Sequence, residues 1–164
     1  MSVEDAHEFF EGEADIMRSL TALLDVGLGY LRLGQPATEL SGGEAQRVKL
    51  GSELQRAQSG DTLYVLDEPT SGLHCADTDR LVAHLQTLVV AGNTVVMVEL
   101  DMRVIAQADH VIDLGPGAGG DRGQVVAAGT PAEVAGSSTS ASARYLATAL
   151  EEAAAVSRVD TVVA

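Results

Sequence analysis

The chain has 164 residues, of which 46% are hydrophobic, and its 24 acidic and 10 basic side chains give a net charge of −14. The length suits one soluble globular domain, and the charge disfavours direct, strong binding of nucleic acid by the chain alone because a polyanion is repelled. Trp is absent, with only three Tyr and two Phe, so the sequence also offers no aromatic platform for stacking bases.

Features of secreted and membrane proteins are missing from this sequence. No apolar run approaches the length that crosses a bilayer, and the acidic N-terminal stretch SVEDAHEFFEGE is unlike a signal peptide. We therefore expect a cytoplasmic protein with no membrane partner. Cys75 is the single cysteine, so an internal disulfide is excluded and we expect no zinc site in this chain.

The first third of the chain has helical periodicity. Apolar residues recur on one helical face in three segments, and Ser2 with Asp5 forms a capping-box pattern before the first of them. The helices predicted from these segments cover residues 3–11, 15–24 and 44–55.

From residue 62 onward, short β-rich runs alternate with helical segments. Buried strands are expected in TLYVLDEP (62–69), NTVVMVEL (93–100) and HVIDLG (110–115), with QVVAAG (124–129) as an edge strand. Helices are expected over 77–90, 102–108, 131–135 and 143–153, and the glycine-rich segment 115–123 is expected to be a turn. This alternation predicts an α/β domain with a mainly parallel sheet flanked by helices. We expect residues 1–150 to form that domain and 151–164 to be a disordered, acidic and Ala-rich tail.

A Ser-Gly-Gly turn stands directly before the helix predicted from residue 44. Unpaired N–H groups and a partial positive charge at a helix N-terminus can hold an anion, so Ser41, Gly42 and Gly43 are candidates for phosphate binding. Ser41 and Glu44 also match an ordinary capping box. Taken alone, the turn is therefore better explained as a helix cap.

A second motif, VLDEPTSGL, places Asp67 and Glu68 side by side at the end of a predicted buried strand. Ligands of parallel α/β sheets sit at the carboxyl ends of strands. An Asp there can hold Mg²⁺ through water, and an adjacent Glu can orient water for attack on a phosphoryl group. The alternative is a strand that ends in a polar turn with both carboxylates solvated. With LSGGEAQ upstream, we favour the functional interpretation.

Both motifs resemble those of ATP-binding-cassette (ABC) ATPases. LSGGEAQRVKL (40–50) resembles their signature motif, and LYVLDEPTSGL (63–73) resembles their Walker B strand with its D-loop. Three longer stretches resemble the C-terminal nucleotide-binding domain of the UvrA family: DVGLGYLRLGQPATELSGGEAQRVKLGSEL, GNTVVMVE and ADHVIDLGPGAGGDRGQVVAAGTPAEVA. The resemblance extends from residue 1 to about 150. It implies an incomplete ABC nucleotide-binding domain associated with nucleotide excision repair of DNA.

The resemblance also implies roles for individual residues. The signature residues would contact the γ-phosphate of ATP held by an opposing nucleotide-binding domain: Ser41, Gly42, Gly43 and Gln46. Asp67 would bind Mg²⁺ through water, and Glu68 would be the catalytic residue that polarises the attacking water. The D-loop residues at the dimer seam would be Ser71, Gly72 and Leu73.

The cofactors implied are ATP and Mg²⁺. The partners implied are a UvrA-type domain or chain that bears a Walker A motif, a UvrA-like dimer, and DNA only indirectly through such a complex.

The sequence departs from the family pattern in three places. It contains no G-x-x-x-x-G-K-[ST] motif, since its only lysine, Lys49, is followed by Leu50. The cysteine pairs of zinc modules are absent. Leu100 stands where the family's switch histidine is expected, and a leucine cannot hydrogen-bond a phosphate. We therefore expect no ATP hydrolysis by the chain alone.

Three functions remain open at this point. The chain could be part of a repair ATPase with composite ATP sites, which predicts an exposed apolar surface where the rest of the sheet packs. It could instead be a non-catalytic interaction module or a degenerate fragment, which Leu100 favours and the intact Asp67 and Glu68 oppose. A UvrA-like component of a drug-resistance ATPase is the third possibility.

Overall fold

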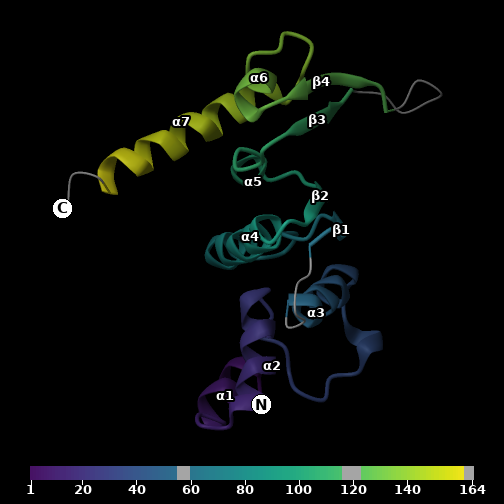
Figure 1. Ribbon diagram of the computed structural model, residues 1–164, viewed down its shortest axis with the longest axis vertical. Helices are drawn as coiled ribbons and strands as arrows, with labels where there is room; N and C mark the ends of the chain where they lie inside the picture. Colours follow the sequence, from purple (N-terminus) through teal and green to yellow (C-terminus); the bar gives the residue numbers. More distant parts are fainter. Residues whose placement is uncertain (55–59, 116–122, 161–164) are drawn as a thin grey trace. The chain divides into compact units, whose positions relative to one another are not determined.

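The computed structural model describes residues 1–54, 60–115 and 123–160 (Figure 1). They fall into two compact units, Met1–Glu99 and Leu100–Ala164, and each is treated by itself below. No helix among the described residues is both long and apolar enough to cross a membrane.

The first unit begins with helices and ends with two strands. Ser2 and Asp5 form the predicted capping box at the start of its first helix, which confirms that reading of the sequence. The elements in chain order are α1 (Val3–Phe9), α2 (Ala14–Asp25), the short 3-10 helix η1 (Ala37–Glu39), α3 (Gly42–Leu54), β1 (Leu63–Asp67), α4 (Cys75–Val90) and β2 (Thr94–Val98).

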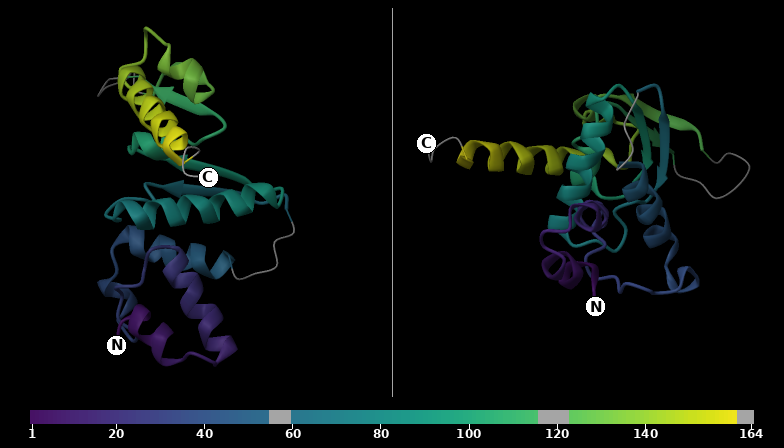
Figure 2. Two further views of the ribbon diagram at one scale, coloured as in Figure 1. Left: turned by 90° about the vertical axis from the view of Figure 1, so that its left-hand side faces the viewer. Right: turned by 60° about the horizontal axis from the view of Figure 1, so that its bottom comes forward.

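The strands β1 and β2 pair in parallel, and α4 connects them and runs alongside them (Figure 2). The register places Val65 opposite Val96. One face of this pair packs into a hydrophobic core that includes Leu28, Leu50, Leu66, Leu81 and Leu88. The other face carries apolar side chains that are exposed: Leu63, Val65, Val96 and Val98.

The second unit is a hairpin with helices. Its elements are α5 (Met102–Ile105), β3 (Val111–Leu114), β4 (Val125–Gly129), α6 (Pro131–Ala135) and α7 (Ala143–Asp160). β3 and β4 pair in antiparallel fashion with an irregularity between Asp113 and Leu114. α5 and α6 both pack on α7, which places Val104, Val134 and Leu146 in the interior of this unit.

The predicted α/β fold class is confirmed, with helices flanking a small parallel sheet. Each predicted helix and strand occurs, with ends shifted by a few residues. The strands expected to be buried at 62–69, 93–100 and 110–115 are instead exposed at alternate positions, because one face of each is not covered by the described residues of its unit. Three predictions fall partly outside the described residues. They are the glycine-rich turn at 116–122, the last residue of the helix predicted over 44–55, and the tail at 161–164.

The C-terminal segment differs from the prediction. Disorder was expected from residue 151, but α7 continues as helix to Asp160. The segment EEAAAVSRVD contains neither Gly nor Pro and includes Ala, Glu and Arg, which favour helix, so the helix propagates from its packed first half. The chain divides into two compact units after Glu99. That residues 1–150 form one functional domain stays a prediction.

Candidate nucleotide site

The first component of the site is the signature turn, Ser41, Gly42 and Gly43. α3 begins at Gly42, and Ser41 and Glu44 form a reciprocal capping box. The Ser41 backbone N–H donates to Glu44 Oε2 over 2.7 Å, and the Glu44 N–H donates to Ser41 Oγ over 3.2 Å. Among the described residues, no atom accepts a hydrogen bond from the N–H groups of Gly42 and Gly43, and a Cβ on Gly42 would point into open space. The turn can therefore offer two helix N-terminal donors to an anion that approaches the backbone closely.

Glu44 is fixed from a second side by Tyr30, whose hydroxyl donates to Glu44 Oε1 over 2.7 Å. This hydrogen bond, followed by those from the backbone and hydroxyl of Ser41, holds the pKa of the Glu44 carboxyl below its ordinary value. Partial burial, and then the bond to Glu44, raise the pKa of Tyr30. Glu44 is consequently a carboxylate at neutral pH, and its charge lies beside the signature turn.

Asp67 and Glu68, the carboxylates of the motif that resembles Walker B, form the second component. Asp67 is the last residue of β1, and both side chains are exposed. No described side chain forms a hydrogen bond or ion pair with either carboxylate. Carboxylate oxygens are ligands that Mg²⁺ prefers, but among the described residues no group of three or more His, Cys, Asp or Glu side chains gathers to hold a metal ion. Glu68 has a φ of 43°, in the left-handed region that side chains other than glycine rarely adopt.

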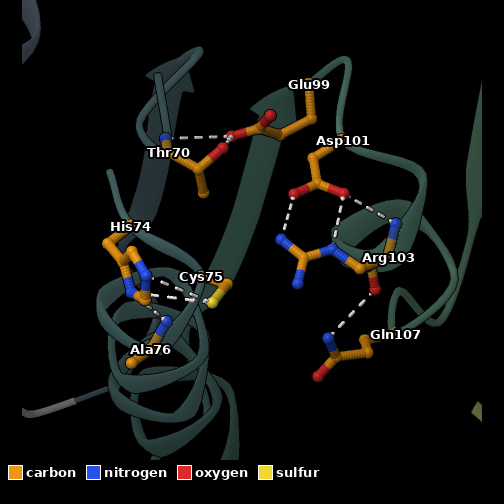
Figure 3. Close-up of polar contacts among 8 residues, drawn as sticks. All are labelled: Thr70, His74, Cys75, Ala76, Glu99, Asp101, Arg103 and Gln107. Carbon is orange, nitrogen blue, oxygen red and sulfur yellow. Dashed lines mark hydrogen bonds and ion pairs between the residues drawn. The ribbon is translucent and has the colours of Figure 1, made fainter. Parts of the chain in front are cut away.

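The loop after β1 is bonded to the end of β2. The Glu68 N–H donates to the Val98 carbonyl over 2.8 Å. Thr70 donates to Glu99 Oε1 from its N–H over 3.1 Å and from its hydroxyl over 2.7 Å (Figure 3). The Glu99 carboxylate therefore accepts hydrogen bonds from both the N–H and the hydroxyl of Thr70. No sequence pattern indicated this role for Glu99.

α3 contributes two consecutive side chains to the same loop. In the orientation that satisfies both partners, the Gln46 amide donates to the Asp67 carbonyl and accepts from the Asp67 N–H, each over 3.0 Å. Arg47 donates from one guanidinium nitrogen to the carbonyls of Pro69, over 3.0 Å, and Ser71, over 3.2 Å. The two motifs that the sequence singled out are thus in direct contact through α3.

The D-loop residues Ser71, Gly72 and Leu73 lead into α4. Ser71 and Gly72 are exposed, Leu73 is partly buried, and Gly72 has a φ of 75° that suits glycine. The next residue, His74, caps α4 by accepting from the Ala76 N–H, and its ring lies beside Cys75 Sγ (Figure 3). Ser71 and Gly72 are accordingly accessible to a partner.

Leu100 begins the second unit, and its side chain is 73% exposed. The adjacent Asp101 caps α5 by accepting from the Arg103 N–H over 2.9 Å, and its carboxylate pairs with the Arg103 guanidinium over 2.8 Å (Figure 3). The bond to Arg103 holds the pKa of Asp101 below its ordinary value. The segment that follows Glu99 thus begins with an exposed hydrocarbon and then a capped helix.

Comparison with known proteins shows that the resemblance to UvrA extends beyond the two motifs to nearly the whole chain. No family model matches it. The UvrABC system protein A of Methanothermobacter thermautotrophicus is 60% identical over 139 residues, 85% of this chain, and that of Micrococcus luteus is 57% identical over 147 residues, 90% of the chain. The crystal structure of UvrA2 from Deinococcus radiodurans superposes with a TM-score of 0.82 at 61% identity and covers 92% of this chain. The chain is similar to a segment of UvrA proteins.

The match covers most of this chain but only a small part of each relative. The chain spans 14% and 15% of the length of the UvrA proteins from the two organisms named first, and 18% of the UvrA2 chain. The UvrA resemblance therefore describes a part, and the activity of a whole UvrA protein is not carried over by similarity alone.

Proposed function

We propose that this chain supplies the signature and Walker B residues of composite ATP sites in a UvrA-type ABC ATPase associated with nucleotide excision repair. A domain or chain bearing Walker A supplies the phosphate-binding lysine. The observation that supports this proposal best is the direct contact between the two motifs: Gln46 of the signature helix bonds the backbone of Asp67. A shared framework of this kind is expected where both motifs serve ATP chemistry, and a mere helix cap does not require it.

Each residue has a role in this proposal. The N–H groups of Gly42 and Gly43 hold the γ-phosphate of ATP bound by the partner, and Ser41, the residue before α3, contacts the same phosphate. Asp67 holds Mg²⁺ through water, and Glu68 polarises the attacking water. When bound, Mg²⁺ neutralises charge on the phosphates. Ser71, Gly72 and Leu73 contact the partner at the seam of a UvrA-like dimer.

The exposed face of the β1–β2 pair supports an incomplete domain. Leu63 and Val65 on β1 are 61% and 67% exposed, and Val96 and Val98 on β2 are 48% and 55% exposed. Paired apolar side chains on a parallel strand pair are normally covered, because parallel sheets are buried on both faces. In our proposal, apolar elements of the Walker A-bearing partner cover this face.

ATP turnover tests the proposal. We expect none from the chain alone, and Mg²⁺-dependent turnover when it is mixed with a Walker A-bearing fragment of a UvrA-type protein. Glu68→Gln is expected to retain ATP binding in the mixture and to lower turnover on the order of 100-fold or more. Asp79→Asn is the matched control, since Asp79 is an exposed carboxylate on α4 outside the site. A silent mixture, or one in which Glu68→Gln turns over normally, contradicts the proposal.

The alternative is a non-catalytic interaction module that binds UvrA-type proteins. It is favoured by the exposed hydrocarbon of Leu100, which cannot serve a phosphate. The same experiment separates the two functions, because a pure interaction module binds the partner without turnover and tolerates Glu68→Gln.

A further inference from the structure

Glu68 has a backbone conformation that needs external support. Its φ of 43° lies in the left-handed region, which is sterically disfavoured for a residue with a side chain. Strain of this kind persists where the surrounding structure holds the backbone in place. The bonds around Glu68 therefore show what determines the position of its carboxylate.

On one side, the bonds come from α3. Gln46 satisfies both backbone groups of Asp67, the residue before Glu68, and Arg47 binds the carbonyl of Pro69, the residue after it. The same Arg47 nitrogen also binds the Ser71 carbonyl. Two adjacent side chains of one helix thus fix the backbone immediately before and after Glu68.

On the other side, the bonds come from the end of β2. The Val98 carbonyl accepts from the Glu68 N–H, and the Glu99 carboxylate accepts twice from Thr70. The loop of residues 68–73 is accordingly held between α3 and β2.

The burial of Arg47 is difficult to explain by stability alone. The residue is 2% exposed, and its Nε has no hydrogen-bond partner among the described residues. Burying a charged group without full hydrogen bonding is unfavourable, and well-packed apolar side chains often replace such groups with no loss of stability. The position of this arginine is better explained by the geometry that it imposes on the carbonyls of Pro69 and Ser71.

We propose that Gln46 and Arg47 are positioning residues that hold the loop of residues 68–73 so that the Glu68 carboxylate keeps its place. They act through the backbone of Asp67, Pro69 and Ser71. Gln46 thereby takes a part in addition to the signature contact implied by the family resemblance. The catalytic consequence of this inference rests on the proposed function, whereas the positioning itself concerns this chain alone.

Hydrogen exchange of the chain without nucleotide or partner tests the positioning. In Arg47→Met we expect the amides of Glu68, Thr70, Ser71 and Leu73 to exchange about tenfold faster, while amides in the core of α4 keep their rates. Lys49→Met is the matched control, since it removes the same charge from the exposed side of α3. Arg47→Lys, which keeps the charge and can restore one bond, is expected to fall between the two, and it serves as the test variant if Arg47→Met does not fold.

Turnover in the mixture with a Walker A-bearing fragment then tests the consequence. We expect Arg47→Met to lower kcat on the order of 10- to 100-fold with little change in KM for ATP, and Arg47→Lys to restore part of the loss. If the unaltered mixture is silent, the proposed function fails, and faster exchange in Arg47→Met still supports the positioning. Unchanged loop exchange in folded Arg47→Met and Arg47→Lys overturns the inference.

Discussion

Glu68 combines a chemically important side chain with an unfavourable backbone conformation, and the two can be separated by substitution. Glycine adopts a φ of 43° without steric conflict, whereas alanine does not. We expect Glu68→Gly to have a free energy of unfolding about 1 kcal/mol higher than Glu68→Ala, the reverse of the usual order. Urea unfolding followed by circular dichroism measures this difference.

A matched position exists outside the site. Asp61 has a φ of 60° just before β1, so Asp61→Gly and Asp61→Ala should show the same order of stability. In the mixture with a Walker A-bearing fragment, the Asp61 variants should keep their turnover, while both Glu68 variants should lose it. Equal stability of Gly and Ala at residue 68 would mean that the left-handed conformation there is not strained.

The Glu44 carboxylate makes stability depend on pH. Its pKa in the folded chain is lowered by the bonds from Tyr30 and Ser41, so the folded state favours the charged form. The contribution is fully present above the unfolded pKa, about 4.3, and is lost as pH falls through the lower folded pKa. We expect the difference in unfolding free energy between the unaltered chain and Glu44→Gln to shrink from pH 7 to pH 3.

At the residue scale, the sequence predicts what lies within a few positions along the chain. The capping box from Ser41 to Glu44 could be read directly, because its partners are three residues apart. The bonds of Arg47 to Pro69 and Ser71 and of Glu99 to Thr70 join residues more than twenty positions apart. They depend on how α3 and β2 pack around β1, which local patterns do not encode.

At the element scale, the exposed face of the β1–β2 pair gives a prediction of its own. Val65 and Val96 are opposite each other in the register, and both are exposed. We expect the double variant Val65→Thr, Val96→Thr to bind less of a dye specific for apolar surfaces and to change unfolding free energy by about 0.5 kcal/mol or less per site. The measure is dye fluorescence at equal protein concentration.

Val90→Thr is the control for that experiment, because Val90 is 87% exposed at the end of α4, away from the sheet face. Its dye binding should match that of the unaltered chain. If the double variant binds as much dye as the control, the sheet face is covered in solution, and the proposal that a partner covers it loses its support.

The elements themselves were largely predictable. Alternation of β-rich runs with helical segments identified the strand Leu63–Asp67 and the helix Pro131–Ala135, the second with its bounds correct. The antiparallel pairing of β3 with β4 depends on a partner in space, so periodicity could not show it. α7 extends to Asp160, beyond the expected helix end at residue 153, because the added residues include good helix formers and neither Gly nor Pro.

At the scale of the whole molecule, the net charge can be read from the sequence, whereas the division into two compact units cannot. The division after Glu99 follows from contacts and has no signature in composition, since no Pro- or Gly-rich linker lies there. The net charge of −14 belongs to the full sequence and could be read at once. It governs long-range interactions, whereas the contacts govern the local geometry of each unit.

The charge makes a prediction about DNA. Proteins that neutralise phosphates bind more tightly as salt is lowered, typically by about 10³-fold or more between 200 and 50 mM salt for several contacts. This chain repels a polyanion, so lowering salt should strengthen the repulsion, and we expect no binding of a labelled duplex at either concentration in fluorescence anisotropy. A Walker A-bearing UvrA-type fragment, added in a parallel titration, is the comparison. Binding by the chain alone that strengthens at low salt would reveal a basic surface that the net charge conceals, and DNA contact would then no longer depend on a partner.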